Sequence, residues 1–211
     1  MFTFDTDGFL AAYRTTFPDP ALTAEADAGL NTLLDALAQD PDVTDARWAA
    51  YMLATVKHEC ANTWRPIEEF GKGRGHPYGE PVTIVGPDGT QYTNAYFGRG
   101  YVQLTWRLNY ANMGQKLGLA NALVLHPDHA LEPATAYAVM SYGMRHGSFT
   151  GVGLHRYIFD NTADYFNARR IINGTDRAAT IQAYAQNLER IIRASLAGGE
   201  AAAQGAATGG A

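Results

Sequence analysis

The chain has 211 residues, of which 46% are hydrophobic and 18% are charged. This composition is too apolar for a wholly disordered chain, and no apolar run approaches the roughly 18 residues of a membrane-spanning helix, so we expect no stable membrane insertion. The formal net charge of -5 disfavours a nucleic-acid partner, because attraction to phosphates would have the wrong sign. The length favours one domain.

Cysteine usage and the first residues bear on where the protein is made. Cys60 is the only cysteine, which excludes an internal disulfide and a multi-cysteine metal site. Residues 1–7 contain neither a basic nor an apolar region, so no signal peptide is expected and we predict synthesis in a reducing cytosol. We expect one catalytic domain over residues 1–196, followed by a flexible Gly/Ala-rich tail at 197–211.

Helices dominate the predicted structure, because caps and apolar spacing of three and four residues recur along most of the chain. We expect helices at about 5–17, 30–40, 45–59, 108–117, 133–144, 162–172 and 177–196.

The third of these helices gives the first functional clue. At about 100° per residue, Glu59 lies within roughly 40° of Trp48 and Met52, whereas Lys57 points to the opposite side. The carboxylate of Glu59 is therefore expected to leave from the buried stripe of the helix. Pro66 is expected to end the helix.

Glycoside hydrolysis needs one protonated carboxyl near the leaving oxygen and one carboxylate that activates water or attacks carbon. Glu59 suits the acid role, because partial burial beside Trp48 and Trp64 would disfavour its charged form and raise its pKa. The alternative interpretation is an ion pair of Glu59 with Arg65 or Arg99 at the helix end.

Two further acids follow the expected helix break. Glu68 and Glu69 lie on a loop after Pro66 that could face Glu59 across a cleft. Adjacent glutamates are more often a solvated charge pair, and the spacing alone favours that interpretation.

Residues 71–100 are rich in glycine, proline and tyrosine and predict a small β lobe or flap. Within this segment, 82–85 and 90–92 flank the turn residues 86–89, a pattern that is typical of a β-hairpin.

The densest polar cluster lies in the run from Asn94 to Trp106. Glycines flank Arg99, and Gln103 and Thr105 fall two residues apart, so in an extended segment both side chains would point the same way and line a sugar site. The alternative is an ordinary loop that enters a helix.

Three segments together resemble glycoside hydrolase family 19 chitinases and the related phage endolysins: His58-Glu59, the run Tyr96 to Trp106 (YFGRGYVQLTW), and Ile171 to Gly174 (IING). The resemblance covers roughly residues 45–195. It implies a mainly α, lysozyme-like α+β fold, in which a helical body and a small β-hairpin lobe at about 71–100 flank the cleft.

The resemblance also implies site residues. Glu59 falls on the family's general acid, Glu68 on the base of the endolysin branch, and Thr105 on the residue that holds the nucleophilic water. Glu69 and Glu80 stay open as bases. The implied substrate-binding residues are Gln103, Asn109, Asn173, Tyr96 and Arg99. The family inverts configuration, which agrees with a base set back far enough to admit water.

The sequence thus predicts an endolysin-type peptidoglycan hydrolase, lysozyme-like and cleaving β-1,4 glycosidic bonds, with a chitinase as the alternative. Plant-type chitinases carry disulfide cysteines and a longer acidic loop, which this chain lacks, so the endolysin branch is the closer match. We expect a monomer without metal or cofactor, made in the host bacterial cytoplasm and acting on peptidoglycan strands after release.

The sequence also bears on two other functions. A zinc amidase is disfavoured, because Asn62 stands where a zinc-binding helix would place the second histidine after His58. A non-catalytic wall-binding module would use a sugar platform made of Trp64, Tyr96, Trp106 and Arg99. Cys60 is expected to be a packing residue, since it and His58 leave the helix in different directions.

Overall fold

The computed structural model describes residues 1–196, so the predicted tail at 197–211 lies outside the described residues. The helices in chain order are α1 (Thr6–Thr16), α2 (Ala24–Gln39), α3 (Ala46–Glu59), α4 (Arg107–Lys116), α5 (Ala122–Leu125), α6 (Pro133–His146), α7 (Tyr165–Ala168) and α8 (Ala178–Ser195). Short 3-10 turns are η1 (Pro77–Gly79), η2 (Pro127–Leu131), η3 (Leu154–Arg156) and η4 (Arg169–Ile171). No helix within residues 1–196 has the length and apolarity needed to cross a membrane.

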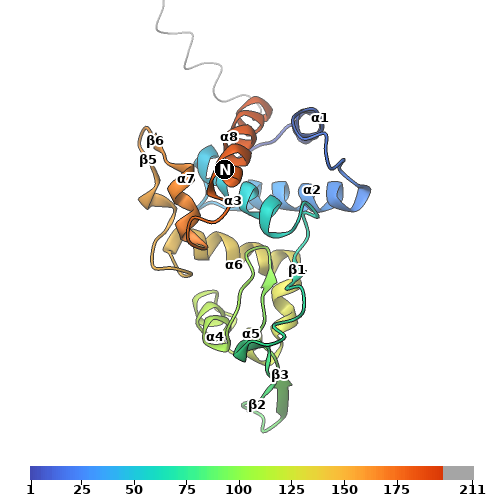
Figure 1. The fold of residues 1–211 in the computed structure, drawn as a ribbon, viewed down its shortest axis with the longest axis vertical. Coiled ribbons are helices and arrows are strands. Elements are labelled where there is room, and N and C mark those ends of the chain that lie inside the picture. The colour runs from blue at the N-terminus through green and yellow to red at the C-terminus, as the bar shows by residue number, and fades with distance from the viewer. Residues whose placement is uncertain (197–211) are drawn as a thin grey trace, which may run out of the picture.

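The strands form three small antiparallel pairs: β1 (Ile67–Glu68) with β4 (Arg99–Gly100), β2 (Val82–Val85) with β3 (Gln91–Asn94), and β5 (Ile158–Phe159) with β6 (Thr162–Ala163). Figure 1 shows a helical body formed by α1, α2, α3, α7 and α8, and a smaller lobe formed by α4, α5 and the β2–β3 hairpin, with α6 between them. The predicted mainly α architecture with a hairpin-bearing lobe is confirmed.

Helix α3 is the centre of the helical body and packs along α8 (Figure 1). Asp45 caps its first turn by accepting a hydrogen bond from the amide of Arg47. Every side chain from Ala49 to Lys57 is buried, so the helix has no solvated face over this stretch. Each large apolar side chain that is buried in this way contributes roughly 1.5–3 kcal/mol, which makes the end of α3 a rigid support.

Helix α3 ends at Glu59, well before Pro66, so the prediction that the proline ends it is wrong. Cys60 caps the helix, and Ala61 (φ 49°) and Asn62 (φ 63°) then adopt left-handed backbone. Asparagine tolerates this conformation better than most residues, and two such residues in succession turn the chain out of the helix.

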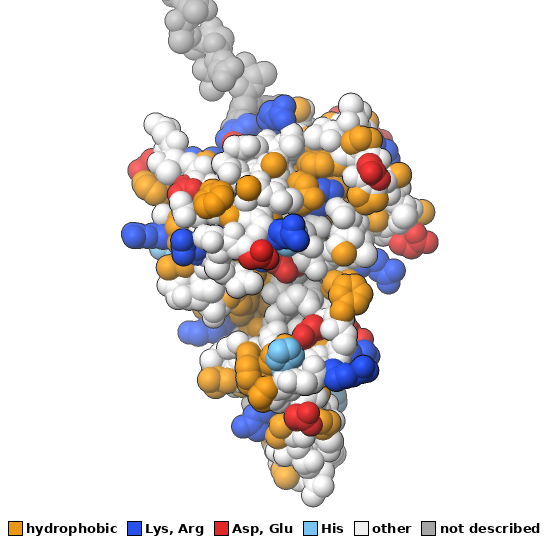
Figure 2. All heavy atoms as spheres, viewed as in Figure 1, with side chains coloured by type: hydrophobic (Ala, Val, Ile, Leu, Met, Phe, Trp, Pro, Cys, Tyr) orange, Lys and Arg blue, Asp and Glu red, His pale blue; other side chains and the backbone are white. Residues whose placement is uncertain are grey.

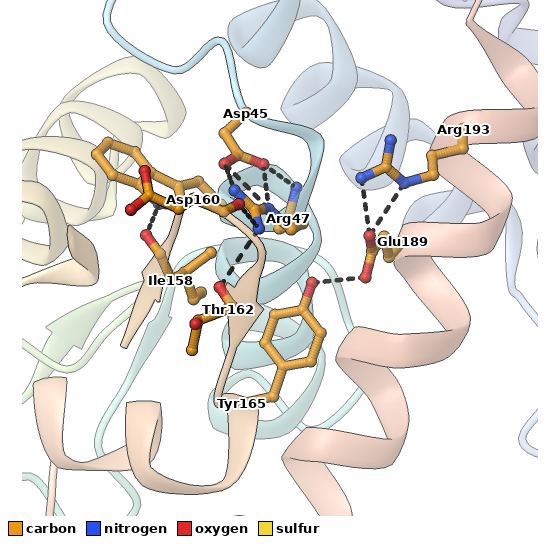
Figure 3. Close-up of polar contacts among 9 residues, drawn as sticks. Asp45, Arg47, Ile158, Asp160, Thr162, Tyr165, Glu189 and Arg193 are labelled. Carbon is orange, nitrogen blue, oxygen red and sulfur yellow. Dashed lines mark hydrogen bonds and ion pairs between the residues drawn. The ribbon is translucent and has the colours of Figure 1, made fainter. Parts of the chain in front are cut away.

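The first turn of α3 is tied to the β5–β6 hairpin by polar contacts (Figure 3). Arg47 pairs with Asp45 at 2.6 Å and donates through Nη1 to the carbonyl of Asp160, also at 2.6 Å. Trp48 Nε1 donates to the carbonyl of Ile158 at 3.0 Å. These contacts fix the hairpin that leads into the segment carrying η4.

Residues 162–172 do not form the single helix that the sequence predicted. The first two residues pair with β5 as β6, Asp164 then caps the short helix α7, and η4 follows. The Tyr165 hydroxyl donates to Glu189 of α8 at 2.8 Å, which holds α7 against that helix (Figure 3). The broken path directs Arg169 of η4 inward.

The smaller lobe contains the hairpin that the sequence predicted. Strands β2 and β3 pair in register from Val82 opposite Asn94 to Val85 opposite Gln91. Asn94 Nδ2 donates to the carbonyl of Leu125 at 2.8 Å, which attaches the hairpin to α5. Strands β1 and β4 were not predicted, because two residues are too few to show alternation.

Lys57 of α3 is buried among aromatic rings. Its Nζ donates to the Tyr13 hydroxyl at 2.7 Å and to Asn62 Oδ1 at 2.8 Å. The ring centroids of Phe17 and Tyr184 lie 4.4 and 5.1 Å from Nζ. Burial lowers the pKa of the amine to about 8, because the charged form is desolvated.

Replacing Lys57 by methionine should change the pH dependence of folding. Between about pH 8 and pH 10.5 the unfolded chain keeps a proton on Lys57 that the folded chain has released, so wild-type stability rises with pH relative to Lys57→Met. We expect a relative gain on the order of 2 kcal/mol between pH 7 and pH 10 in urea unfolding. A difference between the two proteins that does not change with pH would contradict this.

Candidate active site

The carboxylate of Glu59 lies where the buried helix α3 meets the surface. Its side chain is 18% exposed, whereas Met52 and Thr55 of the same helix are fully buried. The sequence predicted a buried stripe that carries Glu59 and an opposite side that carries Lys57, but the helix is buried on all sides from Ala49 to Lys57. The carboxylate is therefore held by a rigid element and is still accessible to a ligand.

Arg169 is the ionic partner of Glu59. Its Nη1 lies 2.5 Å from Glu59 Oε1, its Nε donates to the carbonyl of Asp176 at 3.0 Å, and its side chain is almost completely buried. The prediction of Arg65 or Arg99 as the partner is therefore wrong. The ion pair draws together η4 and the end of α3, and it fixes one oxygen of the carboxylate.

The sequence contained a signal for Arg169. It follows Tyr165 by four residues and precedes Ile172 by three, the spacing of one helix face, whereas its neighbour Arg170 falls off that face. In the structure Tyr165 and Arg169 are buried and Arg170 is exposed. A cation on an apolar face needs an acidic partner, and the nearby acid at the end of α3 provides it.

Glu68 lies on β1, directly opposite Arg99 of β4 in the strand register. Its side chain is 33% exposed, and its Oε2 lies 2.8 Å from Nζ of Lys72. Lys72 had not been identified from the sequence. The exposed ion pair leaves the Glu68 carboxylate open to water.

Glu69 is bound within the protein by both of its carboxylate oxygens. Oε1 accepts from the Tyr78 hydroxyl at 3.0 Å, and Oε2 accepts from the amide of Gly98 at 2.9 Å. Desolvation and the hydrogen bond to Glu69 raise the pKa of Tyr78. Glu80, the third acid considered as a base, is exposed just before β2.

Gln103 and Thr105 converge, although the segment is not extended as predicted. Gln103 has a φ of 54°, and its Nε2 donates to the carbonyls of Ile67 and Gly100, each at 3.2 Å. Thr105 Oγ1 donates to the carbonyl of Gln103 at 2.8 Å. Both side chains pack against Gly98, where an added Cβ would lie 2.8 Å from Gln103 Oε1 and 3.2 Å from Thr105 Oγ1.

Tyr96 and Arg99 support this loop from inside. The Tyr96 hydroxyl donates to the carbonyl of Val124 at 2.9 Å, and the side chain is almost fully buried. The guanidinium carbon of Arg99 lies 3.7 Å from the centroid of the Phe97 ring, and its Nε lies 3.0 Å from Asp128 Oδ1. The contacts of both side chains are internal ones.

Asn109 at the start of α4 and Asn173 just after η4 are both exposed. Asn109 Nδ2 donates to the carbonyl of Thr105 at 2.8 Å. Asn173 Oδ1 accepts a hydrogen bond from the backbone amide of Gly174 at 2.9 Å. The backbone amide of Asn173 donates to the carbonyl of Arg169. Each asparagine thus keeps one polar atom free to meet a ligand, Oδ1 of Asn109 and Nδ2 of Asn173.

Cys60 and the histidines were considered for other chemistry. Cys60 is fully buried, and burial raises the pKa of its thiol far above the usual range, so the interpretation as a packing residue is confirmed. Burial lowers the pKa of His58, and the charge of Glu59 opposes this. Among residues 1–196 no group of three or more His, Cys, Asp or Glu side chains could hold a metal ion.

The site therefore offers two partly exposed carboxylates on different parts of the fold. Glu59 belongs to the helical body, and Glu68 belongs to the strand that pairs with the loop of the smaller lobe. Figure 2 shows acidic side chains on both sides of the recess between body and lobe. One carboxyl group that donates a proton and one that accepts a proton are what glycoside hydrolysis requires.

Removing Arg169 should destabilise the protein through Glu59. Arg169→Met leaves a partly buried carboxylate without its counter-charge, and we expect a loss of roughly 2–4 kcal/mol in urea unfolding at pH 7. Arg170→Met, which changes the exposed neighbour, is the matched control and should stay within about 0.5 kcal/mol of wild type.

A double-mutant cycle separates this ion pair from a simple loss of packing. Arg169→Met combined with Glu59→Gln should cost less than the sum of the single changes, with a coupling of about 1–3 kcal/mol. Additive effects would mean that the two side chains do not stabilise each other.

The sequence matches no protein-family model and no curated protein. Solved structures do match. Chitinase C from Streptomyces griseus HUT6037 is 22% identical, covers 92% of this chain and 80% of its own, and has a TM-score of 0.58. A mutant of that enzyme gives a TM-score of 0.55 at 22% identity with the same coverage.

A bacterial family 19 chitinase is 24% identical, covers 87% of this chain and 92% of its own, and has a TM-score of 0.53. At these identities the likeness is one of fold. The chain therefore has the lysozyme-like fold of the family 19 chitinases, mainly α with a small β lobe, as the sequence predicted.

Proposed function

We propose that the chain is an endolysin-type glycoside hydrolase that cleaves β-1,4 bonds in bacterial peptidoglycan by inverting general acid/base catalysis. The observation that carries the proposal is the placement of Glu59, a partly exposed carboxylate at the end of a buried helix with one oxygen fixed by Arg169. The fold shared with family 19 chitinases supports the same reaction class.

Glu59 serves as the general acid. Arg169 holds Oε1 at 2.5 Å, so Oε2 is the oxygen that must take up a proton before each turnover and then give it to the leaving glycosidic oxygen. The rigid end of α3 keeps this oxygen in place, and an accurately placed donor contributes about 10²–10⁴-fold to the rate.

Glu68 serves as the general base. Its carboxylate is a third exposed and ion-paired with a single flexible lysine, so water reaches it. Glu69 is a weaker candidate, because Tyr78 and the Gly98 amide occupy its two oxygens. Glu80 is exposed before β2, and its backbone amide donates to the carbonyl of Pro77.

Thr105 and three amides complete the proposed site. Since Thr105 Oγ1 donates its proton to the Gln103 carbonyl, it meets the nucleophilic water as an acceptor. The free groups for sugar contacts are Gln103 Oε1, Asn109 Oδ1 and Asn173 Nδ2. The proposal leaves Tyr96 and Arg99 out of substrate contacts, because their buried side chains bond within the loop.

Local positive charge favours peptidoglycan over neutral chitin. Exposed Arg170 and Arg177 flank the segment that carries Asn173. These cations suit the carboxylates of a peptidoglycan strand, although the protein as a whole is acidic. Chitin is the second candidate substrate, because the structures of similar fold are named as chitinases.

Turbidity loss of purified peptidoglycan and sugar release from chitin, both with a chelator present, test the proposal. Glu59→Gln and Glu68→Gln should each lose at least about 100-fold in rate, because each removes a proton-transfer group. Wild type should clear walls faster than it releases sugar from chitin.

Glu80→Gln is the matched control and should keep wild-type activity, because this glutamate lies outside the proposed site. If Glu69→Gln proved inactive while Glu68→Gln stayed active, the base would have to be reassigned. Wall clearance by Glu59→Gln at the wild-type rate would contradict the proposed function, and so would a wild type that degrades neither polymer.

A further inference from the structure

An aromatic surface lies on the smaller lobe beside the candidate site. The rings of His76 and Tyr78 stack with centroids 5.0 Å apart and an interplanar angle of 5°. The Trp106 ring meets Tyr78 edge-on, with centroids 5.1 Å apart. We call these three residues the aromatic platform. Figure 2 shows hydrophobic and histidine side chains grouped on the lobe below the recess.

Trp106 is exposed, although its ring is large and apolar. Its side chain is 48% exposed, whereas Trp64 is fully buried and Trp48 is bonded through Nε1 to Ile158. Of the three aromatic residues that the sequence offered for a sugar platform, only Trp106 therefore reaches the surface; Tyr96 is buried like Trp64.

The backbone at Trp106 is strained in a way that presents the ring. Its φ is 74°, a value that bulky residues rarely adopt. The amide of Trp106 donates to the carbonyl of Tyr96, and its carbonyl accepts from the amide of Asn109, both at 2.9 Å. Neighbouring residues thus hold a conformation that an isolated chain would avoid, a pattern that clusters at binding sites.

Two members of the platform, Trp106 and Tyr78, adjoin the proposed catalytic residues. Trp106 directly follows Thr105, the proposed water-holding residue. Tyr78 donates to Glu69, the neighbour of the proposed base Glu68, at 3.0 Å. This hydrogen bond also fixes the orientation of the Tyr78 ring, so the platform is ordered before a ligand arrives.

We propose that the aromatic platform is a sugar subsite, in which the exposed ring of Trp106 stacks on the apolar face of an N-acetylhexosamine ring of the glycan strand next to the bond that is cut, and Tyr78 supports the Trp106 ring edge-on. The assignment rests on the proposed function. A pyranose ring presents C–H groups on its face and hydroxyl groups at its edge, which matches exposed rings bordered by the polar groups of Asn109 and Glu69. The ring of His76 extends the platform away from the site.

Fluorescence titration with a stem-peptide-free peptidoglycan glycan fragment, and separately with an N-acetylglucosamine hexamer, tests this subsite. The protein carries Glu59→Gln to stop turnover. The exposed Trp106 should dominate the change in tryptophan emission, because Trp64 is buried and Trp48 is bonded within the body. Adding Trp106→Ala should remove that change and, measured by calorimetry, weaken binding about tenfold.

Phe159→Ala is the matched control, because Phe159 is 47% exposed on β5 of the helical body, away from the lobe (Figure 1). It should leave binding unchanged. Trp106→Tyr should recover most of the affinity, since it restores a ring. Equal melting temperatures of the variants would show that the loss is not one of folding.

The outcomes separate this inference from the proposed function. A wild type that cleaves glycans, together with Trp106→Ala that binds both probes as tightly as the control, would overturn the subsite and leave the proposed hydrolase standing. Loss of self-association in Trp106→Ala, with glycan binding intact, would assign the platform to a second copy and overturn the subsite as well. A wild type without cleavage but with Trp106-dependent binding would overturn the proposed function alone.

Discussion

The ion pair between Arg169 and Glu59 joins two segments that are 110 residues apart in the sequence. It places a charged group of the short turn η4 against the end of the most buried helix, and each charge offsets part of the desolvation cost of the other. The fold around it serves this contact. The hairpin β5–β6, the contact of Tyr165 with Glu189 and the left-handed turn after Glu59 all fix the two ends of the pair.

The second carboxylate of the candidate site, that of Glu68, lies on a short strand and not on a buried helix. Glu68 lies on a two-residue strand held by β4, and side chains of the loop that follows β4 pack closely against Gly98, where an added Cβ would lie 2.8 Å from Gln103 Oε1. This loop also brings Thr105 and exposes Trp106. The proposed acid in the helical body and the proposed base on the strand pair beside the lobe thus come from different elements of the fold.

The sequence predicted α3, α6 and α8 well, because their apolar spacing is clear, whereas α2 begins at Ala24, six residues before its expected start at residue 30. It failed where two or three residues decide the path. The end of α3 depends on left-handed Ala61 and Asn62 rather than on Pro66, and the break in 162–172 depends on pairing between β5 and β6. Such effects of tertiary structure leave almost no periodic signal.

The candidate site shows the same limit. Glu59, Glu68 and Thr105 were singled out by helix geometry and spacing before the resemblance gave them roles, whereas Asn109 and Asn173 were identified as site residues through the resemblance alone. The partner Arg169 and the internal roles of Tyr96 and Arg99 were missed. Whether an arginine or a tyrosine faces outward is set by packing between distant segments, and a motif alone does not record it.

In the proposed mechanism, Glu59 donates a proton while Glu68 activates a water on the opposite face of the sugar. Proton NMR of freshly released reducing ends, recorded during hydrolysis of peptidoglycan glycan strands by the wild-type protein, tests it most directly. The account predicts that the α-anomer appears first from the β-linked substrate and then mutarotates. Initial release of the β-anomer would show retention and would contradict the two-carboxylate, water-mediated mechanism.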